Sequence, residues 1–157
     1  MITIQRAVKE DLNKIILLEK EWGKESNYAP EISLKHKKDI LNVIKNKRKY
    51  IFYIAKIDNK IVGFVYGMLI NAKDQIPAFN IKTGEKYGVI NEIYVKKSYR
   101  GKGIGKKFIK EIISNFKKIG VKRVRITAGS ENLDKLVKYY ESIGFHRKTT
   151  NLVFSIN

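Results

Sequence analysis

The spacing of hydrophobic residues changes along the chain, and each change predicts a new element. Apolar and polar residues alternate over Ile2–Ala7, which is typical of a half-buried strand. From Leu12 to Trp22 the apolar residues recur at helical spacing behind an acidic first turn, and a second helix follows over roughly Leu34–Lys47. The stretch Gly23–Ser33 between them contains Gly, Ser, Asn and Pro, so we expect a loop there.

Two β-branched and aromatic segments in the middle of the chain predict a hairpin. Tyr50–Ile57 and Lys60–Ile70 are separated only by Asp58 and Asn59, which favour a tight turn. The next stretch, Asn71–Tyr87, contains proline and glycine and has no clear periodicity, so it is predicted to be a long loop. Loops of this length in compact domains are often functional.

The second half of the chain alternates strands with helices. We expect a strand, a helix, a strand, a helix and one or two closing strands, in the order Gly88–Lys97, Gly103–Ile119, Val121–Ala128, Glu131–Ile143 and Phe145–Ile156. The central strand–helix–strand unit requires a right-handed crossover between parallel strands. The whole pattern has no internal repeat or linker and predicts one α/β domain with a mixed sheet.

The amino-acid composition excludes several kinds of catalytic and metal-binding site. The chain has 157 residues, and 43% of them are hydrophobic, enough to bury a core. The absence of cysteine excludes disulfides, thiolate zinc sites and a cysteine acyl-enzyme. The two histidines, His36 and His146, are far apart, which argues against a His-rich metal site or a Ser–His–Asp triad. No apolar run approaches the ~18 residues of a membrane span and the first residues lack a signal-peptide core, so we expect a cytoplasmic protein with no membrane partner.

The positive charge is concentrated in one segment. The chain carries a net charge of +18, and the stretch from Lys96 to Arg125 holds twelve basic residues against one acid, Glu111. An anionic partner is expected to dock near this segment, and a nucleic acid, a membrane surface and a phosphorylated cofactor all fit that expectation. A solvated, lysine-rich helix face would give the same charge pattern.

A glycine-rich loop lies at the start of the helix predicted from residue 103. Three glycines occupy alternate positions between Tyr99 and Lys106, namely Gly101, Gly103 and Gly105. Alternating glycines let a backbone approach a ligand closely, and a helix start offers unpaired N–H groups to an anion. The loop differs from a Walker loop, because Arg100 stands where that loop needs glycine and Lys107 replaces its hydroxyl residue. Its Gly-x-Gly-x-Gly spacing also differs from the dinucleotide-binding fingerprint.

Two motifs in the right order indicate a family. The Arg-x-x-Gly-x-Gly pattern from Arg100 to Gly105, with its Tyr-Arg-Gly lead-in, resembles the acyl-CoA pyrophosphate loop of the GNAT N-acetyltransferase superfamily. Further along, the Tyr-Glu-Ser-Ile-Gly-Phe segment that begins at Tyr140 resembles the family's Tyr-Glu-x-x-Gly-Phe. The opening around Arg6 and the strand segment that begins at Gly63 are also similar, so the resemblance covers nearly the whole chain.

The resemblance implies both a fold and a reaction. The fold would occupy residues 1–157 as a single N-acetyltransferase domain, with a mixed, mostly antiparallel sheet of about six to seven strands flanked by about four helices. The reaction would move the acetyl group of acetyl-CoA directly to a primary amine, on a small molecule or on a protein or peptide, in one ternary complex and without a metal. Because lysine-type amines have a pKa near ~10.4, a proton must leave before the amine can attack.

The family's catalytic roles fall on two residues of this chain. Tyr140 matches the tyrosine that precedes Glu-x-x-Gly-Phe, and by resemblance it would protonate the departing CoA thiolate. It also continues the apolar stripe of Leu133 and Val137, so a tyrosine packed in the core would give the same pattern. Glu92, in the segment Asn91–Val95, matches an acid that serves as the base through water. An exposed strand carboxylate paired across the sheet, or ordered waters without a dedicated base, would also fit.

The resemblance also implies the contacts with acetyl-CoA. Backbone groups of Ile93 and Val95 would pair with the pantetheine arm as an added strand, and one N–H there would serve the thioester oxygen. The residues expected to wrap the pyrophosphate, mainly through backbone N–H groups, are Arg100, Gly101, Lys102, Gly103, Gly105 and Lys106. Asn132 matches an asparagine near the pantetheine, although a residue that caps the following helix would look the same.

Two other functions compete with amine acetylation. A nucleic-acid-binding module would use the same basic surface, but the chain lacks an aromatic-rich RNP strand, zinc-ligand spacing and a tripartite helical pattern, so nucleic acid is disfavoured as a partner. A sensor that binds acyl-CoA without turnover would keep the fold, and the presence of Tyr140 and Glu92 argues against it. The sequence does not decide whether the chain forms a homodimer.

The acceptor amine is not specified by the sequence. In the family it is shaped by the two predicted loops, which here contain Glu25, Tyr28, Glu31, Asp74 and Glu85. This slight excess of acid suits an amine. A polycationic acceptor such as an aminoglycoside or a polyamine would face the net charge of +18, so it is disfavoured. A protein N-terminus, a lysine and a small amine all stay open.

Overall fold

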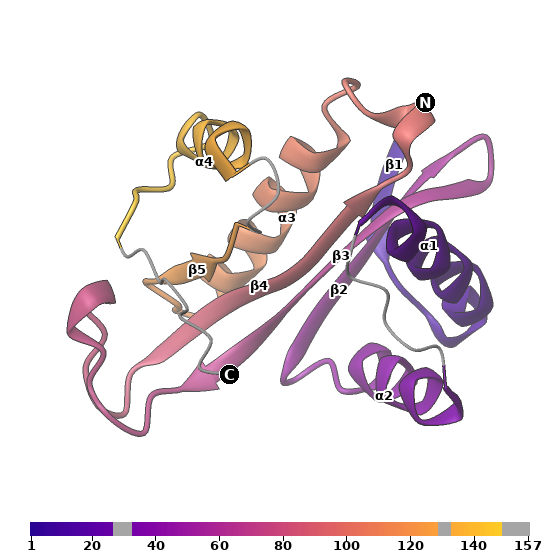
Figure 1. Cartoon of the computed structure of the whole chain (residues 1–157). Helices are drawn as coiled ribbons and strands as arrows, with labels where there is room; N and C mark the ends of the chain where they lie inside the picture. Colours follow the sequence, from indigo (N-terminus) through magenta and orange to yellow (C-terminus); the bar gives the residue numbers. More distant parts are fainter. Residues whose placement is uncertain (27–32, 129–132, 149–157) are drawn as a thin grey trace, which may run out of the picture.

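The computed structural model describes residues 1–26, 33–128 and 133–148 of the chain. Within them, five strands form one sheet in the order β1-β2-β3-β4-β5 (Figure 1). The strands are β1 Ile2–Arg6, β2 Tyr50–Ile57, β3 Lys60–Asn71, β4 Lys86–Val95 and β5 Val124–Ile126. Strands β1 to β4 pair antiparallel, including the predicted β2–β3 hairpin, and β5 pairs parallel with β4.

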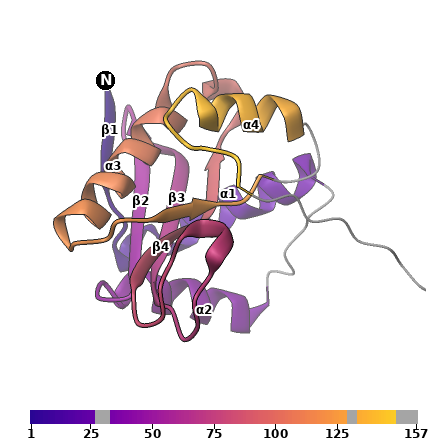
Figure 2. The ribbon, with the colours of Figure 1, turned by 90° about the vertical axis from the view of Figure 1, so that its left-hand side faces the viewer.

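In the described residues, four helices cover the two faces of this sheet. They are α1 Leu12–Glu25, α2 Leu34–Lys45, α3 Ile104–Lys118 and α4 Leu133–Glu141. Helices α1 and α2 lie on one face, whereas α3 and α4 lie on the other (Figure 1 and Figure 2). Helix α3 is the crossover between the parallel strands β4 and β5. No helix in this part of the chain is long and apolar enough to cross a membrane.

The predicted fold class is confirmed, with differences at the C-terminal end. The described sheet has five strands rather than six to seven, and β5 occupies only the middle of the predicted Val121–Ala128. Pairing of β5 stops opposite Ile90, because β4 carries an extra residue, Asn91, at the next position and bends there. Of the closing strands predicted over Phe145–Ile156, residues 145–148 are irregular and the rest lie outside the described residues.

Each face of the sheet buries its own hydrophobic cluster. The α3-side core includes the apolar stripe of α3, formed by Ile104, Phe108, Ile112 and Phe116. The α1/α2-side core includes Ile15, Ile16, Leu18, Ile40 and Ile44 from the helices, with Phe52, Phe64 and Tyr94 from the strands. Gly88 of β4 lets α3 lie close to the sheet, because a Cβ there would come within 2.6 Å of the Phe116 ring.

A bulge in β4 determines to which face of the sheet each of the following side chains points. The β3–β4 register shifts by one residue at Asn91, and beyond it Tyr66 lies opposite Glu92. Ile93 packs against the α3-side core, while Tyr94 is buried in the α1/α2-side core. Because side chains alternate along a strand, Glu92 points to the same face as Tyr94, toward α1 and α2.

Candidate active site

Glu92 is a half-buried carboxylate on the α1/α2 side of β4. Its Oε1 accepts a hydrogen bond from the Tyr66 hydroxyl at 3.2 Å, directly across the β3–β4 pair. Burial, together with the negative charge of Glu19, raises the pKa of Glu92 to about 7. A carboxyl with this pKa exchanges a proton near neutral pH, where a general base works best. Glu92 is therefore paired across the sheet, with Tyr66 as its partner, and it is partly buried rather than exposed.

Tyr140 lies in the α3-side core, on the opposite face of the sheet from Glu92. It is 8% exposed, and its ring centroid lies 5.5 Å from that of Tyr139 and 6.0 Å from that of Phe145. Burial, with a smaller effect of Tyr139, raises the pKa of Tyr140, so its hydroxyl keeps its proton at neutral pH. It also lines a cavity of about 780 Å³ between β5 and α4. Tyr140 is thus a core side chain that still has a proton to donate.

The edge of β4 that faces β5 is open beyond the bulge. Within the described residues, β5 pairs with β4 only as far as Ile90. The Lys96 N–H donates to the Val62 carbonyl of β3 at 2.9 Å, and alternate residues of a strand direct their backbone groups to opposite sides. Ile93 and Val95 therefore direct theirs away from β3, toward the open edge. These are the two residues predicted to pair with a pantetheine arm, and an extended ligand can add to such an edge as a further strand.

The glycine-rich loop forms the start of α3. Gly103 precedes the first helical residue with a left-handed backbone, φ 76°, and Gly101 has φ 77°. A Cβ at either glycine would meet no described atom within 4 Å, so the space in front of the loop is open. The Lys107 N–H makes the first helical hydrogen bond, to the Gly103 carbonyl, and the three N–H groups before it have no acceptor within the helix. Lys102 and Lys106 are exposed beside them, so the loop offers donors and positive charge to an anion.

Gly105 has a structural role that the sequence did not predict. A Cβ at this position would lie 2.6 Å from the Tyr139 hydroxyl of α4. The glycine therefore leaves room for the Tyr139 hydroxyl at the first turn of α3, where the two motifs lie side by side. Burial raises the pKa of Tyr139 as well.

Arg100 is turned away from the loop, toward α1. Its guanidinium contacts the Glu25 carboxylate and donates through Nε to the Val95 carbonyl at 2.8 Å. The Tyr94 hydroxyl donates to the other oxygen of Glu25 at 2.8 Å. Although burial acts to raise it, the hydrogen bonds from Tyr94 and Arg100 lower the pKa of Glu25 overall. Arg100 therefore joins the loop to the last turn of α1, and its contact with a pyrophosphate stays a prediction.

Part of the predicted site lies outside the described residues. This applies to Asn132, predicted near the pantetheine, and to Tyr28 and Glu31 of the first predicted acceptor loop. In the second acceptor loop, Glu85 accepts a hydrogen bond from the Lys82 N–H at 3.0 Å and is held in a local turn.

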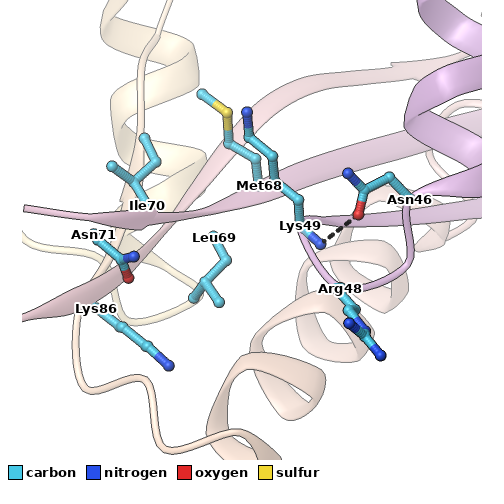
Figure 3. Close-up of a pocket in the computed structure, with 8 residues that line it drawn as sticks. All are labelled: Asn46, Arg48, Lys49, Met68, Leu69, Ile70, Asn71 and Lys86. Atoms are coloured by element: carbon cyan, nitrogen blue, oxygen red, sulfur yellow. Dashed lines mark hydrogen bonds between the residues drawn. The ribbon is translucent and has the colours of Figure 1, made fainter.

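A second cavity lies at the other end of β3 and β4. It has a volume of about 680 Å³ and is lined by residues 68–71 of β3 together with Asn46, Arg48, Lys49 and Lys86 (Figure 3). None of the predicted site residues in the described part of the chain lines it. Among all the residues that the structure describes, no three His, Asp or Glu side chains gather in a way that could hold a metal ion.

Sequence reasoning missed three polar residues that act on Glu92, namely Glu19, His36 and Tyr66. Glu19 had a usable signal, because it is a charged residue within the otherwise apolar stripe that predicts α1. Tyr66 had none, since its place opposite Glu92 depends on a bulge that the hydrophobic pattern does not reveal.

Comparisons with known proteins identify the family and the fold. The profile of the Acetyltransferase (GNAT) family matches residues 10–145. An uncharacterized N-acetyltransferase from Methanocaldococcus jannaschii is 34% identical over 97 residues, which are 62% of this chain but only 39% of that protein. The aminoglycoside antibiotic 6'-N-acetyltransferase from Acinetobacter baumannii has a TM-score of 0.78 at 14% identity, over 100% of this chain and 99% of the other. A protein from Clostridium acetobutylicum, described as a predicted acetyltransferase and crystallised with acetyl-CoA, has a TM-score of 0.74 at 21% identity, over 100% and 96%.

The two sequence motifs lie side by side in the fold. One forms the start of α3 and the other ends α4, and the two helices touch through Gly105 and Tyr139. The family profile spans most of the sequence, and the similar folds extend over its whole length. The chain belongs to the acetyltransferase (GNAT) family.

Proposed function

We propose that this chain transfers the acetyl group of acetyl-CoA directly to a primary amine while both substrates are bound. The observation that carries the proposal is the meeting of three features near one end of β4: a carboxyl with a pKa of about 7, an open backbone edge and a basic helix start. Each feature serves a different part of the reaction. Family membership supports the same assignment, and so does the acetyl-CoA bound to the C. acetobutylicum protein.

Acetyl-CoA supplies an activated thioester and an anionic pyrophosphate. In the proposed complex the loop from Gly101 to Lys106 surrounds the pyrophosphate with backbone N–H groups and lysine charge. Ile93 and Val95 hydrogen-bond to the pantetheine arm along the open edge of β4. The Val95 carbonyl already accepts from Arg100, and its second lone pair is available to the arm. Asn132 is assigned to the same arm on the family resemblance alone.

Glu92 removes the proton that blocks attack. An ammonium group has no free lone pair, so one N–H bond must break before a C–N bond can form. Glu92 accepts this proton and becomes a neutral acid, which its partly buried setting favours. The free amine then attacks the thioester carbonyl carbon, and a backbone N–H at the β4 edge stabilises the developing oxyanion.

Tyr140 supplies the proton for the leaving group. As the C–S bond breaks, the CoA sulfur takes the electron pair, and the Tyr140 hydroxyl donates its proton to it. The nitrogen, which still carries one proton too many for an amide, releases it to solvent, and solvent returns a proton to the Tyr140 phenolate. Tyr140 and Glu92 approach from opposite faces of the sheet, so the reacting carbon would lie at the open edge between them. The rings of Tyr139 and Phe145 hold the Tyr140 ring in place.

The acceptor would approach from the α1/α2 side, where Glu92 lies. We expect a small monoamine or a peptide amine rather than a polycation, because the net charge of +18 repels the latter. The A. baumannii aminoglycoside enzyme shares only 14% identity with this chain, so its likeness supports the fold and not its acceptor.

A release assay tests the proposal. The purified chain is incubated with acetyl-CoA and, in turn, a small monoamine, a lysine-containing peptide, a peptide with a free N-terminus and an aminoglycoside, and free CoA thiol is measured. We expect release above the no-amine rate with at least one monoamine or peptide, and no increase with the aminoglycoside. Saturable acetyl-CoA binding without thiol release from any amine would contradict catalysis and favour a sensor. Nucleic-acid binding that weakens steeply with salt would favour the basic module instead.

A further inference from the structure

A buried acid and an imidazole lie on the α1/α2 side of the sheet, the side to which Glu92 points, and the proposed reaction does not use them. Glu19 of α1 is 1% exposed, and its Oε2 lies 2.7 Å from Nε2 of His36 on α2. The start of α2 holds His36 in place, because its N–H donates to Ser33 Oγ at 3.1 Å. The His36 side chain is 23% exposed, so the pair connects the interior of the α1/α2 side with solvent.

Stability alone explains this pair poorly. Glu19 lies on the buried face of α1 among Ile15, Ile16 and Leu18, where an apolar residue would continue the stripe. A buried carboxylate loses its hydration, and replacing a buried ion pair with apolar residues of similar volume is often neutral or stabilising. Burial raises the pKa of Glu19, and the hydrogen bond and charge of His36 only partly offset that effect. A titratable pair at this position therefore needs another explanation.

The described groups that act on the Glu92 carboxyl come from three elements. Tyr66 of β3 donates to it, which favours its ionised form. The negative charge of Glu19 on α1 disfavours that form, and the positive charge of a protonated His36 on α2 favours it. With Glu19 ionised, the Glu19–His36 pair thus presents Glu92 with one negative charge when His36 is neutral and with no net charge when His36 is protonated.

We propose that the Glu19–His36 pair is a positioning element that sets the proton affinity of Glu92, and with it the pH at which the chain acetylates its amine. With His36 neutral, the uncompensated charge of Glu19 makes Glu92 a stronger base. Protonation of His36 cancels that charge and weakens the base. Neither residue needs to touch a substrate, and only the link to acetylation rests on the proposed function.

A carbon-13 NMR titration of the Glu92 carboxyl tests this coupling without an acceptor. The chain is labelled in glutamate, and the Glu92→Gln variant identifies the Glu92 signal. Glu19→Gln keeps the shape of the side chain and a hydrogen-bonding group for His36 but removes the charge. We expect the Glu92 titration midpoint to fall by about one pH unit in Glu19→Gln. A midpoint equal to that of the wild type overturns the proposal.

Glu21→Gln is the matched control. Glu21 lies on the same helix, but its side chain is 43% exposed and pairs with Lys96 at 2.9 Å. The Glu92 midpoint should stay at its wild-type value in this variant, and a shift equal to that of Glu19→Gln would overturn the proposal. If Glu19→Gln does not fold, His36→Gln replaces it. That variant removes the imidazolium charge and keeps an N–H for Glu19, so the Glu92 midpoint should rise, and an unchanged midpoint overturns the proposal.

Kinetics separates this proposal from the proposed function. With an acceptor from the release assay, the acidic limb of kcat/KM should move to lower pH in Glu19→Gln and stay in place in Glu21→Gln. If the enzyme is active but the Glu92 midpoint is the same in Glu19→Gln as in the wild type, only the positioning role is overturned. If Glu19→Gln shifts the Glu92 titration midpoint but leaves the acidic limb of kcat/KM in place, Glu92 is not the base. The claim that the pair sets the pH of acetylation is then overturned as well.

Discussion

The two faces of the sheet differ in what they bury near the end of β4. Among the described residues, the buried carboxylates are Asp11 and Glu19, and both lie by α1, on the side that Glu92 faces. The α3-side core is apolar except for tyrosines, and the positive charge of α3 lies on its exposed surface, including Lys106 at its start. The buried carboxylates therefore lie on one face of the sheet, and the exposed lysines of α3 lie on the other.

This separation suits two requirements that conflict. A carboxylate beside the glycine loop would repel a pyrophosphate, and a lysine beside Glu92 would lower its pKa and weaken it as a base. The bulge at Asn91 allows one strand to satisfy both requirements. It directs Glu92 toward α1 and α2, while the backbone of Ile93 faces the open edge. The proposed mechanism therefore uses both faces of β4.

The largest expected effect is on the α3 side. Tyr140→Phe removes one hydroxyl and keeps the ring in its core, so we expect kcat to fall by ~10²-fold with little change in acetyl-CoA affinity. The measurement is turnover under conditions where chemistry limits the rate. Tyr139→Phe is the matched control, and it should keep near-wild-type turnover. A folded Tyr140→Phe enzyme with wild-type kcat would return Tyr140 to a purely structural role.

On the other face, Glu92→Gln removes the base but keeps the shape and the Tyr66 partner. We expect kcat at neutral pH to fall by ~10-fold or more, with partial recovery at high pH, where more of the acceptor is already free amine. The wild-type rate should rise through an acidic limb near pH 7, the pKa of Glu92. A variant with the same pH–rate profile as the wild type would rule out Glu92 as the base.

The stability of the same variant, relative to that of the wild type, should increase from acidic to alkaline pH. The folded chain raises the pKa of Glu92 from 4.5 to about 7, so between these values it binds a proton that the unfolded chain has released. Stability from this group is thus full below pH 4.5 and is lost as the pH rises through 7. We measure the free energy of unfolding of both proteins in urea and subtract the wild-type value from that of Glu92→Gln. We expect this difference to be larger at pH 8 than at pH 4 by on the order of 1–2 kcal/mol. A loss at pH 8 would mean that cross-strand pairing dominates.

The smallest effect is expected where α1 meets the loop. Glu25→Gln weakens the contact with Arg100, but these side chains are 29% and 48% exposed, so the ion pair contributes less than about 1 kcal/mol. The melting temperature should fall by no more than about 2–4 °C. Glu21→Gln, which breaks a similarly exposed pair with Lys96, should behave alike. A much larger loss in Glu25→Gln alone would reveal a stronger link between the two faces.

The sequence predicted the elements well where a periodic apolar stripe defines them. Helix α3 was found in this way, and local residue types and glycine spacing located the hairpin and the loop at the start of α3. Strand β5 was predicted too long, since its length depends on how far β4 stays regular. The closing strands fall largely outside the described residues, and so does Asn132.

The polar surroundings of Glu92 could not be predicted in the same way. Its pairing with Tyr66 follows from the one-residue bulge, and its coupling to Glu19 and His36 follows from how two helices pack on the sheet. Both are tertiary features with no fixed spacing in the sequence. The turn of Arg100 toward Glu25 is of the same kind, because it joins residues that are 75 positions apart.

A calorimetric titration of acetyl-CoA into Gly103→Asn tests most directly whether the cofactor is held at the start of α3. Gly103 has φ 76°, and Gly120, just beyond the other end of that helix, has φ 78°, with no described atom within 4 Å of a Cβ at either position. Asparagine tolerates a left-handed backbone, so Gly103→Asn and Gly120→Asn carry similar strain, and only the first places a side chain in the proposed path of the pyrophosphate. We predict wild-type affinity in Gly120→Asn and at least about tenfold weaker binding in Gly103→Asn, a loss of about 1.4 kcal/mol. Equal affinity in the wild type and both folded variants would contradict a cofactor site at this loop.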